Sequence, residues 1–236
     1  MPSCDGPVLE AVDLYRAYGP SPVLRGVDLR LGPGEALAVV GPNAAGKTTL
    51  LRILAGLVRP SRGSVRVLGH PPRAVESRRA IGFLAHQSLL YDDLTVLENL
   101  TFAARLYAVP KPREAAARAL AEVGLAERAS SRPRELSRGL LQRASLARAL
   151  VHDPTVLLLD EPFTALDAPT AERLRLVLRR RLARGAAAVL ATHHLGEIWD
   201  LVTRVAVLAG GRWALEEERR GELAAFLPRY QELIHA

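Results

Sequence analysis

The fold of this chain is indicated most clearly by residues 36 to 50, "ALAVVGPNAAGKTTL". The first residues of this stretch, 36 to 40, are apolar without alternation, which is typical of a strand covered on both faces of a parallel sheet. The following "GPNAAGKT" fits G-x-x-x-x-G-K-[ST], and a helical pattern comes next. Strand, glycine-containing loop and helix in this order predict a phosphate-binding loop.

In such a loop, backbone N–H groups and the positive end of the helix surround the phosphate oxygens of a nucleotide. Lys47 would add a point charge, and the Thr48 hydroxyl would be a Mg²⁺ ligand. Many loops of this kind have glycine where Ala44 stands, so we expect a backbone there that tolerates a Cβ. The predicted ATP-binding residues of the loop are Gly41, Pro42, Asn43, Ala44, Ala45, Gly46, Lys47, Thr48 and Thr49.

A second apolar strand, "TVLLLDEP" at 155 to 162, ends in two carboxylates. We expect Asp160 to hold Mg²⁺, directly or through water. We expect Glu161 to be the general base that accepts a proton from the attacking water. A strand with an acidic turn would look the same in isolation, and the phosphate loop upstream favours the functional interpretation.

The turn "LSRGLLQR" at 136 to 143 is a second candidate anion site. Ser137 offers a hydroxyl and Gly139 an N–H at the start of the helix "LLQRASLARAL", residues 140 to 150, whose dipole favours an anion. A serine that caps an ordinary helix explains the same pattern without a ligand. The pattern alone therefore does not say why a chain with one phosphate loop would have another such turn.

Taken together, these motifs resemble the ATP-binding subunits of ABC transporters, from about Val8 to Leu215. Gln87 in "FLAHQS" matches the family's Q-loop glutamine, and Asp167 in "TALD" matches its D-loop. His193 in "ATHH" matches the switch histidine. Tyr18 in "RAYG" matches the aromatic residue that stacks on adenine.

The resemblance implies that each ATP lies between the phosphate loop of one subunit and the "LSRG" signature of another. A second copy of the chain is then a partner, and Ser137 and Gly139 contact the γ-phosphate. Gln87 would be a catalytic and metal residue that senses closure, His193 a catalytic residue near the γ-phosphate, and Asp167 an ATP-binding residue. Other implied partners are integral membrane transporter subunits, with the chain peripheral at the cytoplasmic face of the membrane.

The signature departs from the common LSGGQ at two positions. Arg138 replaces a glycine and Leu140 replaces the glutamine, which removes a polar side chain near the nucleotide. We expect no side-chain role at position 140.

Apolar runs between turn residues predict strands at 8–15, 23–31, 36–40, 64–68, 81–85, 155–160, 187–193 and 204–215, the last a hairpin at Gly210 and Gly211. A helical pattern from about Leu94 to Ala129 is split by Pro110 and Pro112, and the tail from Gly221 reads as a helix broken near Pro228. These patterns and the resemblance predict an α/β P-loop NTPase core of ABC ATPase architecture. Its mixed sheet has helices, an antiparallel β region and an inserted helical subdomain.

We assign residues 1–236 to one ATP-binding domain. Its core covers about 1–86 and 132–220, its helical subdomain about 87–131, and its C-terminal helix about 221–236.

The composition argues against a nucleic-acid-binding, membrane-spanning or secreted protein. The formal net charge is +7 and the pI is near 10.3, but the positive charge is arginine scattered along the chain, as in "LRLVLRRRLARG" at 174 to 185. We therefore expect a solvated basic surface and no nucleic-acid partner. The sequence has no uncharged apolar stretch of bilayer length, and "MPSCDGPVLE" does not resemble a cleavable signal. The single cysteine, Cys4, can form no internal disulfide.

Among transporters, the segment 83–107 most resembles the ATP-binding subunit of the haem exporter used in cytochrome c maturation. Exporters of drugs, lipids or polysaccharides share "DLTVLENL" and remain open. Two other classes also remain open. A soluble ABC-type ATPase acting on ribosomes or DNA would use the same motifs, and a P-loop kinase would share "GPNAAGKT".

Overall fold

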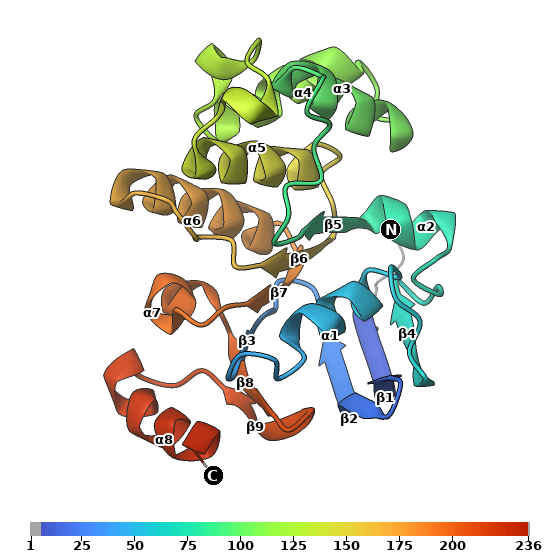
Figure 1. Cartoon of the computed structure of the whole chain (residues 1–236), viewed down its shortest axis with the longest axis vertical. Coiled ribbons are helices and arrows are strands. Elements are labelled where there is room, and N and C mark those ends of the chain that lie inside the picture. Colours follow the sequence, from blue (N-terminus) through green and yellow to red (C-terminus); the bar gives the residue numbers. More distant parts are fainter. Residues whose placement is uncertain (1–5, 236) are drawn as a thin grey trace.

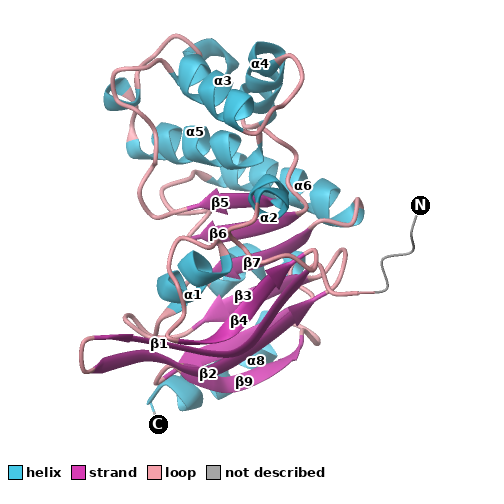
Figure 2. Ribbon diagram, turned by 90° about the vertical axis from the view of Figure 1, so that its right-hand side faces the viewer, coloured by secondary structure: helices cyan, strands magenta, loops and turns pink. Residues whose placement is uncertain are grey.

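The computed structural model describes residues 6 to 235, so Cys4 lies outside the described residues. The chain forms two sheets, of which the larger runs through the middle of the molecule and the smaller lies beside it, away from α3 and α4 (Figure 1, Figure 2). The smaller sheet is antiparallel, with strand order β2-β1-β4, and the larger has the order β5-β6-β7-β3-β8-β9. Neighbours in the larger sheet are parallel except for the antiparallel pair β8 and β9. The predicted mixed sheet and antiparallel β region are confirmed.

The strands follow the predicted apolar runs. Their bounds are β1 Leu9–Tyr18, β2 Ser21–Leu31, β3 Ala36–Val40, β4 Arg62–Val67, β5 Ile81–Leu84, β6 Val156–Asp160, β7 Ala187–Ala191, β8 Arg204–Ala209 and β9 Arg212–Glu218. Strands β3, β6 and β7, predicted to be central and parallel, are buried along their whole length.

The helices surround this sheet on both faces. Their bounds are α1 Lys47–Leu54, α2 Val75–Ala80, α3 Val96–Leu106, α4 Pro112–Glu122, α5 Arg138–Leu150, α6 Ala168–Ala183, α7 Leu195–Ile198 and α8 Leu223–His235. Short 3₁₀ turns lie at Ala126–Arg128, Pro133–Glu135 and Trp199–Leu201. No helix in the described part of the chain has both the length and the apolar character that a bilayer crossing needs.

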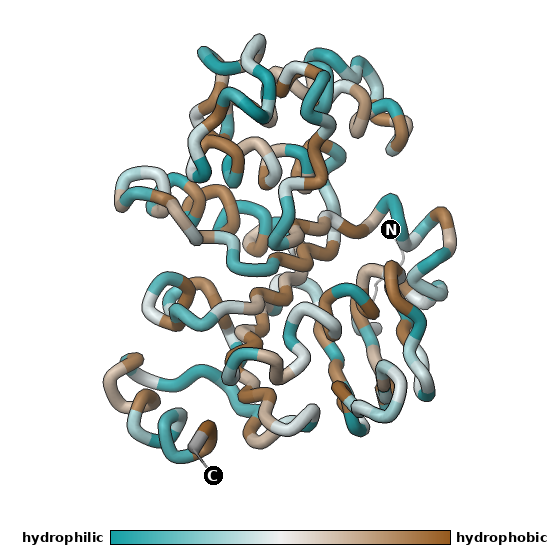
Figure 3. Tube along the Cα trace, viewed as in Figure 1, coloured by the Kyte–Doolittle hydropathy of each residue, from teal (hydrophilic) through white to brown (hydrophobic). Residues whose placement is uncertain are grey.

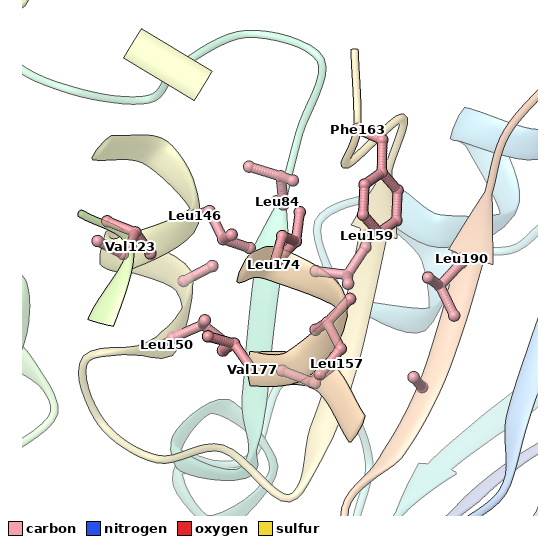
Figure 4. Packing of buried hydrophobic residues seen from close by; sticks show 14 of the residues in the cluster. Leu84, Val123, Leu146, Leu150, Leu157, Leu159, Phe163, Leu174, Val177 and Leu190 are labelled. Carbon is pink, nitrogen blue, oxygen red and sulfur yellow. The ribbon is translucent and has the colours of Figure 1, made fainter. Parts of the chain in front are cut away.

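Side-chain alternation along the central strands divides the core in two. Leu157 and Leu159 of β6 belong to a cluster with residues of α5 and α6, whereas Val156 and Leu158 face a second cluster with α1 and the antiparallel sheet. Figure 4 shows the first cluster, and Figure 3 shows apolar residues gathered along the central strands. Each fully buried leucine contributes about 1.5–3 kcal/mol, so this strand is held from both faces.

Helices α3, α4 and α5 lie together at one end of the molecule (Figure 1). A capping box between Thr95 and Glu98 starts α3. The chain leaves the helical conformation after Leu106 and resumes it at Pro112, so the split at the two prolines is confirmed. Helix α5 begins after the predicted boundary at residue 131 yet packs in the same cluster as α3 and α4. The division of the domain into subdomains stays a prediction.

Three predictions about the helices were wrong. The C-terminal helix is not broken, because α8 continues through Pro228. Its apolar face is held by Phe226, whose ring centroid lies 5.4 Å from that of Trp199, and this packing offsets one missing helical hydrogen bond. Helix α5 begins at Arg138, before the predicted residue 140, because Ser137 already occupies the N-cap.

The third correction concerns the basic face of α6, which was expected to be solvated. Arg181 is buried and its guanidinium lies 2.8 Å from Glu122 and 2.5 Å from Asp153. Two carboxylates supply what burial of a charge requires.

Candidate nucleotide site

The phosphate loop connects β3 to α1, and its backbone requires glycine at both ends. Gly41 has a φ of 149°, and a Cβ there would collide with the carbonyl oxygen of Leu208. Gly46 has a φ of 107° at the N-cap of α1. Ala44 has a φ of 64°, in the left-handed region that costs an alanine about 1 kcal/mol. The expected conformation suited to a Cβ is therefore absent at position 44.

Lys47 spans this loop. Its Nζ donates hydrogen bonds to the carbonyl oxygens of Gly41 at 2.7 Å and Pro42 at 3.0 Å. Burial lowers the pKa of Lys47, while the nearby carboxylates of Glu161 and Asp160 raise it in part. The ammonium group therefore lies in the field of the predicted base, Glu161, and of the predicted metal ligand, Asp160.

Asp160 and Thr48 form the second part of the site. The Thr48 hydroxyl donates a hydrogen bond of 2.8 Å to Oδ2 of Asp160. Burial raises the pKa of Asp160, and the Thr48 bond lowers it in part. No group of three or more His, Cys, Asp or Glu residues that could hold a metal occurs among residues 6–235. A carboxylate beside a hydroxyl nevertheless fits Mg²⁺, which prefers hard oxygen ligands and keeps several waters.

Glu161 is held at both carboxylate oxygens. Its Oε2 accepts a hydrogen bond of 2.9 Å from the Thr192 hydroxyl, and its Oε1 lies 2.7 Å from Nδ1 of His193. The ring of His194 lies against that of His193, with centroids 3.8 Å apart. The structure thus brings the predicted base and the predicted switch histidine together. Sequence reasoning missed Thr192, which directly precedes the histidine in "ATHH".

A cavity of about 420 Å³ opens beside the two carboxylates. It is lined by His86, Gln87, Ser88, Arg138, Leu141, Gln142, Ser145, Asp160, Glu161 and Thr164. Gln87, predicted to be a catalytic and metal residue, therefore shares a cavity with Asp160 and Glu161. Gln142 was also missed by the sequence analysis, and its Nε2 donates to the carbonyl oxygens of Glu161 and Pro162.

The signature turn has the geometry of an ordinary helix cap in this single chain. The Ser137 hydroxyl accepts a hydrogen bond of 3.4 Å from the Leu140 N–H. A Cβ on Gly139 would lie 2.6 Å from the Ala165 carbonyl oxygen, so glycine is required there for packing within the chain. Leu140 packs against the core. The contacts of Ser137 and Gly139 with a nucleotide stay predictions.

Two further predicted ATP-binding residues have local partners. Asp167 caps α6, accepting a 2.9 Å hydrogen bond from the Thr170 N–H, and its contacts with Thr170 lower its pKa. Tyr18 is 46% exposed, and the guanidinium carbon of Arg16 lies 4.3 Å from its ring centroid. Arg16 covers one face of the ring, so a base could stack only on the other. Both ligand roles stay predictions.

Comparison with known proteins identifies similar chains. The family model described as "ABC transporter" matches residues 24–164. The "Aliphatic sulfonates import ATP-binding protein SsuB 1" of Xanthomonas axonopodis pv. citri is 41% identical over 212 residues, 88% of this chain and 83% of that protein. The "Cytochrome c biogenesis ATP-binding export protein CcmA" of Cupriavidus necator is 41% identical over 197 residues, 82% of this chain and 87% of that protein.

A solved bacterial ABC transporter cassette, MJ0796, has the same fold. Its dimeric structure aligns with a TM-score of 0.83 and 28% identity, covering 91% of this chain and 100% of that one. A dimeric post-hydrolysis state of the same cassette, bound to ADP and Pi, aligns with a TM-score of 0.81, at the same identity and coverage.

Proposed function

The chain belongs to the ABC transporter family and is an ATP-hydrolysing subunit of a transporter, and we propose that two copies close over two ATP molecules and power a membrane exporter. The observation that carries the proposal is the convergence of Lys47, Thr48, Asp160 and Glu161 at one end of the central sheet. ATP hydrolysis needs a positive charge near the phosphates, oxygen ligands for a metal ion and a base for the attacking water. These residues supply all three.

In this proposal Glu161 accepts a proton from the attacking water. Thr192 and His193 each contact one of its oxygens, which fixes the direction of the carboxylate. Lys47 and the loop N–H groups orient the β- and γ-phosphates. Thr48 and Asp160, with Gln87 in the same cavity, would hold Mg²⁺, which neutralises charge on the phosphate oxygens.

The partner in this closure is a second copy of the chain. Ser137 and Gly139 lie at the N-terminal end of α5, a position where a helix favours an anion. The dimeric state of the MJ0796 cassette, whose fold this chain shares, supports the arrangement. The γ-phosphate would join the two copies, and hydrolysis with phosphate release would remove that attraction.

The other partner is an integral membrane subunit, for which a large groove offers a docking surface. The groove has a volume of about 810 Å³ and is lined by residues of α2, β5, α3 and the segments beside them. Among them, Val75 and Tyr91 are each 58% exposed and Leu106 is 69% exposed. An apolar surface of this kind marks an interaction site more often than a free surface.

The charge of the groove indicates the chemistry of the segment that binds it. Arg73, Arg78 and Arg79 line the groove, together with Arg148. Arg148 donates to the Phe83 carbonyl oxygen at 2.7 Å, while its buried Nε has no hydrogen-bond partner among the described residues. The four guanidinium groups that line the groove favour a carboxylate in the segment that binds it. We therefore expect an amphipathic segment with an acidic residue.

Residues that line the groove directly follow, in the sequence, residues that line the cavity beside Asp160 and Glu161. Leu89 lines the groove and Gln87 lines the cavity that contains Asp160 and Glu161. A segment docked against Leu89 would therefore respond to any movement of the Gln87 loop. This supports Gln87 as the residue that senses closure.

Co-purification from detergent-solubilised membranes tests the membrane partner. We expect the wild-type chain to bring down integral membrane proteins, and Leu106→Asp in the groove to lose them. Leu176→Asp is the matched control, because Leu176 is 44% exposed on α6 and does not line the groove. Recovery of the same amount of membrane protein with all three chains would count against the proposal. So would recovery of ribosomes or DNA that is lost at high salt.

For the cargo we propose export of the type used in cytochrome c maturation, with the chain peripheral at the cytoplasmic face of the membrane. The resemblance of segment 83–107 and the similarity to CcmA support this choice. A sulfonate import subunit is equally similar, so import is the alternative. Restoration of c-type cytochromes in a host lacking its own exporter, when the chain is supplied with its membrane partners, would support export. Restored growth on sulfonates would favour import.

A further inference from the structure

Gln142 connects the signature helix to the backbone of the predicted base. It lies in α5, just after the "LSRG" turn, and its Nε2 donates to the carbonyl oxygen of Glu161 at 3.0 Å and that of Pro162 at 3.3 Å. Its side chain also lines the cavity that contains Glu161. The motifs that identify the nucleotide site give this residue no role.

The backbone that Gln142 contacts is strained. Glu161 has a φ of 52°, in the left-handed region that costs a non-glycine residue on the order of 1–2 kcal/mol. Only two backbone hydrogen bonds hold this residue in the described structure, from its N–H to the Ala191 carbonyl oxygen and from the Thr164 N–H to its own carbonyl oxygen. The amide of Gln142 is the one side-chain donor to that carbonyl oxygen in the described structure.

A second contact joins α5 to the same loop. Gly139 lies so close to the Ala165 carbonyl oxygen that a Cβ would be only 2.6 Å from it. The first turns of α5 therefore contact both ends of the segment 161–165. Gly139 lies against Ala165, and Gln142 binds Glu161 and Pro162. These two contacts offer a route by which a displacement of the start of α5 would reach the backbone of Glu161.

We propose that Gln142 is a positioning residue through which the signature helix of one copy sets the catalytic base of the same copy. When Ser137 engages the ATP of the partner copy, α5 is fixed, and Gln142 then fixes the backbone that aims the Glu161 carboxylate. Each copy becomes competent at its own ATP only after it has engaged the other. This inference rests on the proposed two-copy closure.

The test compares Gln142→Met with Gln142→Lys in the full chain. Methionine keeps the length and helix propensity but removes the donor, and lysine retains a donor of similar reach. We expect Gln142→Met to lower kcat about 10- to 100-fold with an unchanged Kd for ATP, because a small misplacement of a catalytic group costs this much. Gln142→Lys should recover part of the loss. Arg143→Met is the matched control, since Arg143 also donates to a backbone carbonyl, that of Gly124, away from Glu161.

A double-mutant cycle separates positioning from a general structural role. If Gln142 acts through the carboxylate of Glu161, adding Gln142→Met to Glu161→Gln should not lower the residual single-turnover rate further. An equal loss in both backgrounds, no advantage of lysine over methionine, or a kcat of Gln142→Met within twofold of wild type would overturn the inference. If the wild-type chain itself failed to hydrolyse ATP, the proposed function would be wrong, which is a distinct outcome.

Discussion

Nδ1 of His193 lies 2.7 Å from Oε1 of Glu161, so the histidine after β7 and the carboxylate after β6 are in direct contact. The two strands are parallel neighbours, and Asp160 pairs with Ala191 at their carboxyl ends. This pairing brings residues separated by a whole helix to one edge of the sheet. The contact orients the carboxylate before any substrate binds, which lowers the entropic cost of reaching the reactive geometry.

Glu161→Gln tests the role of this carboxylate. The amide has nearly the same shape but cannot accept a proton, so we expect kcat to fall about 10²- to 10⁴-fold while the Kd for ATP is retained. Because ATP then persists between the two copies, size-exclusion chromatography with ATP and Mg²⁺ should show a stable dimer. Turnover close to the wild-type rate would remove Glu161 from its role.

Lys47→Ala tests the phosphate loop. Alanine removes the ammonium group that donates to the carbonyl oxygens of Gly41 and Pro42. The triphosphate would also lose a positive charge. We expect ATP binding measured by calorimetry to become undetectable. The control is Lys111→Asn, because Lys111 is the other lysine of the chain and forms an ion pair with Glu114 at the surface. Unchanged affinity in Lys47→Ala would contradict the assignment.

Ser137→Arg tests the shared site. Ser137 is exposed at the start of α5, so an arginine there should not disturb the core but should obstruct a second copy. We expect ATP binding by the single chain to persist and ATP-driven dimerisation to be lost. Ser130→Arg places the same side chain at another exposed serine outside the signature and should dimerise normally. A normal dimer of Ser137→Arg would mean that the signature does not face the partner's nucleotide.

Much of the fold and of the site could be predicted from local pattern. Strands β3, β6 and β7 are continuous apolar runs because both of their faces are buried, and the phosphate loop follows from its glycine and lysine spacing between a strand and a helix. Contacts between residues that are far apart in the sequence could not be predicted in this way, because they produce no local sequence pattern. The bonds from Gln142 to the Glu161 backbone and from Thr192 to its carboxylate need the tertiary structure to be seen.

The wrong predictions at Pro228 and Arg181 both result from tertiary packing. Pro228 was expected to break the last helix on local grounds, but the aromatic packing of Phe226 against Trp199 holds the helix together. Arg181 was expected in solvent because it lies in the arginine-rich helical run 174–185, yet Glu122 and Asp153 converge on it from elsewhere in the fold. In each case tertiary contacts override a correct local tendency.

His152 should make the stability of the chain depend on pH. Burial lowers its pKa from 6.5 to about 4. Its ring stacks on Tyr107 with centroids 3.7 Å apart, Nε2 lies 3.0 Å from the Ile81 carbonyl oxygen, and the buried Nδ1 has no partner among the described residues. The folded state therefore holds this imidazole neutral.

The direction of the effect follows from proton binding by the two states. Between pH 6.5 and about 4 the unfolded chain binds a proton at His152 that the folded chain does not, so this contribution to stability is complete above pH 6.5 and is lost as the pH falls toward 4. Between pH 7 and pH 5 the loss is about 2 kcal/mol. We expect His152→Gln, measured by chemical denaturation at both pH values, to lose less stability on acidification than the wild type. His70→Gln, at an exposed histidine, should retain the wild-type dependence, and identical curves for all three chains would show that His152 is protonated equally in both states.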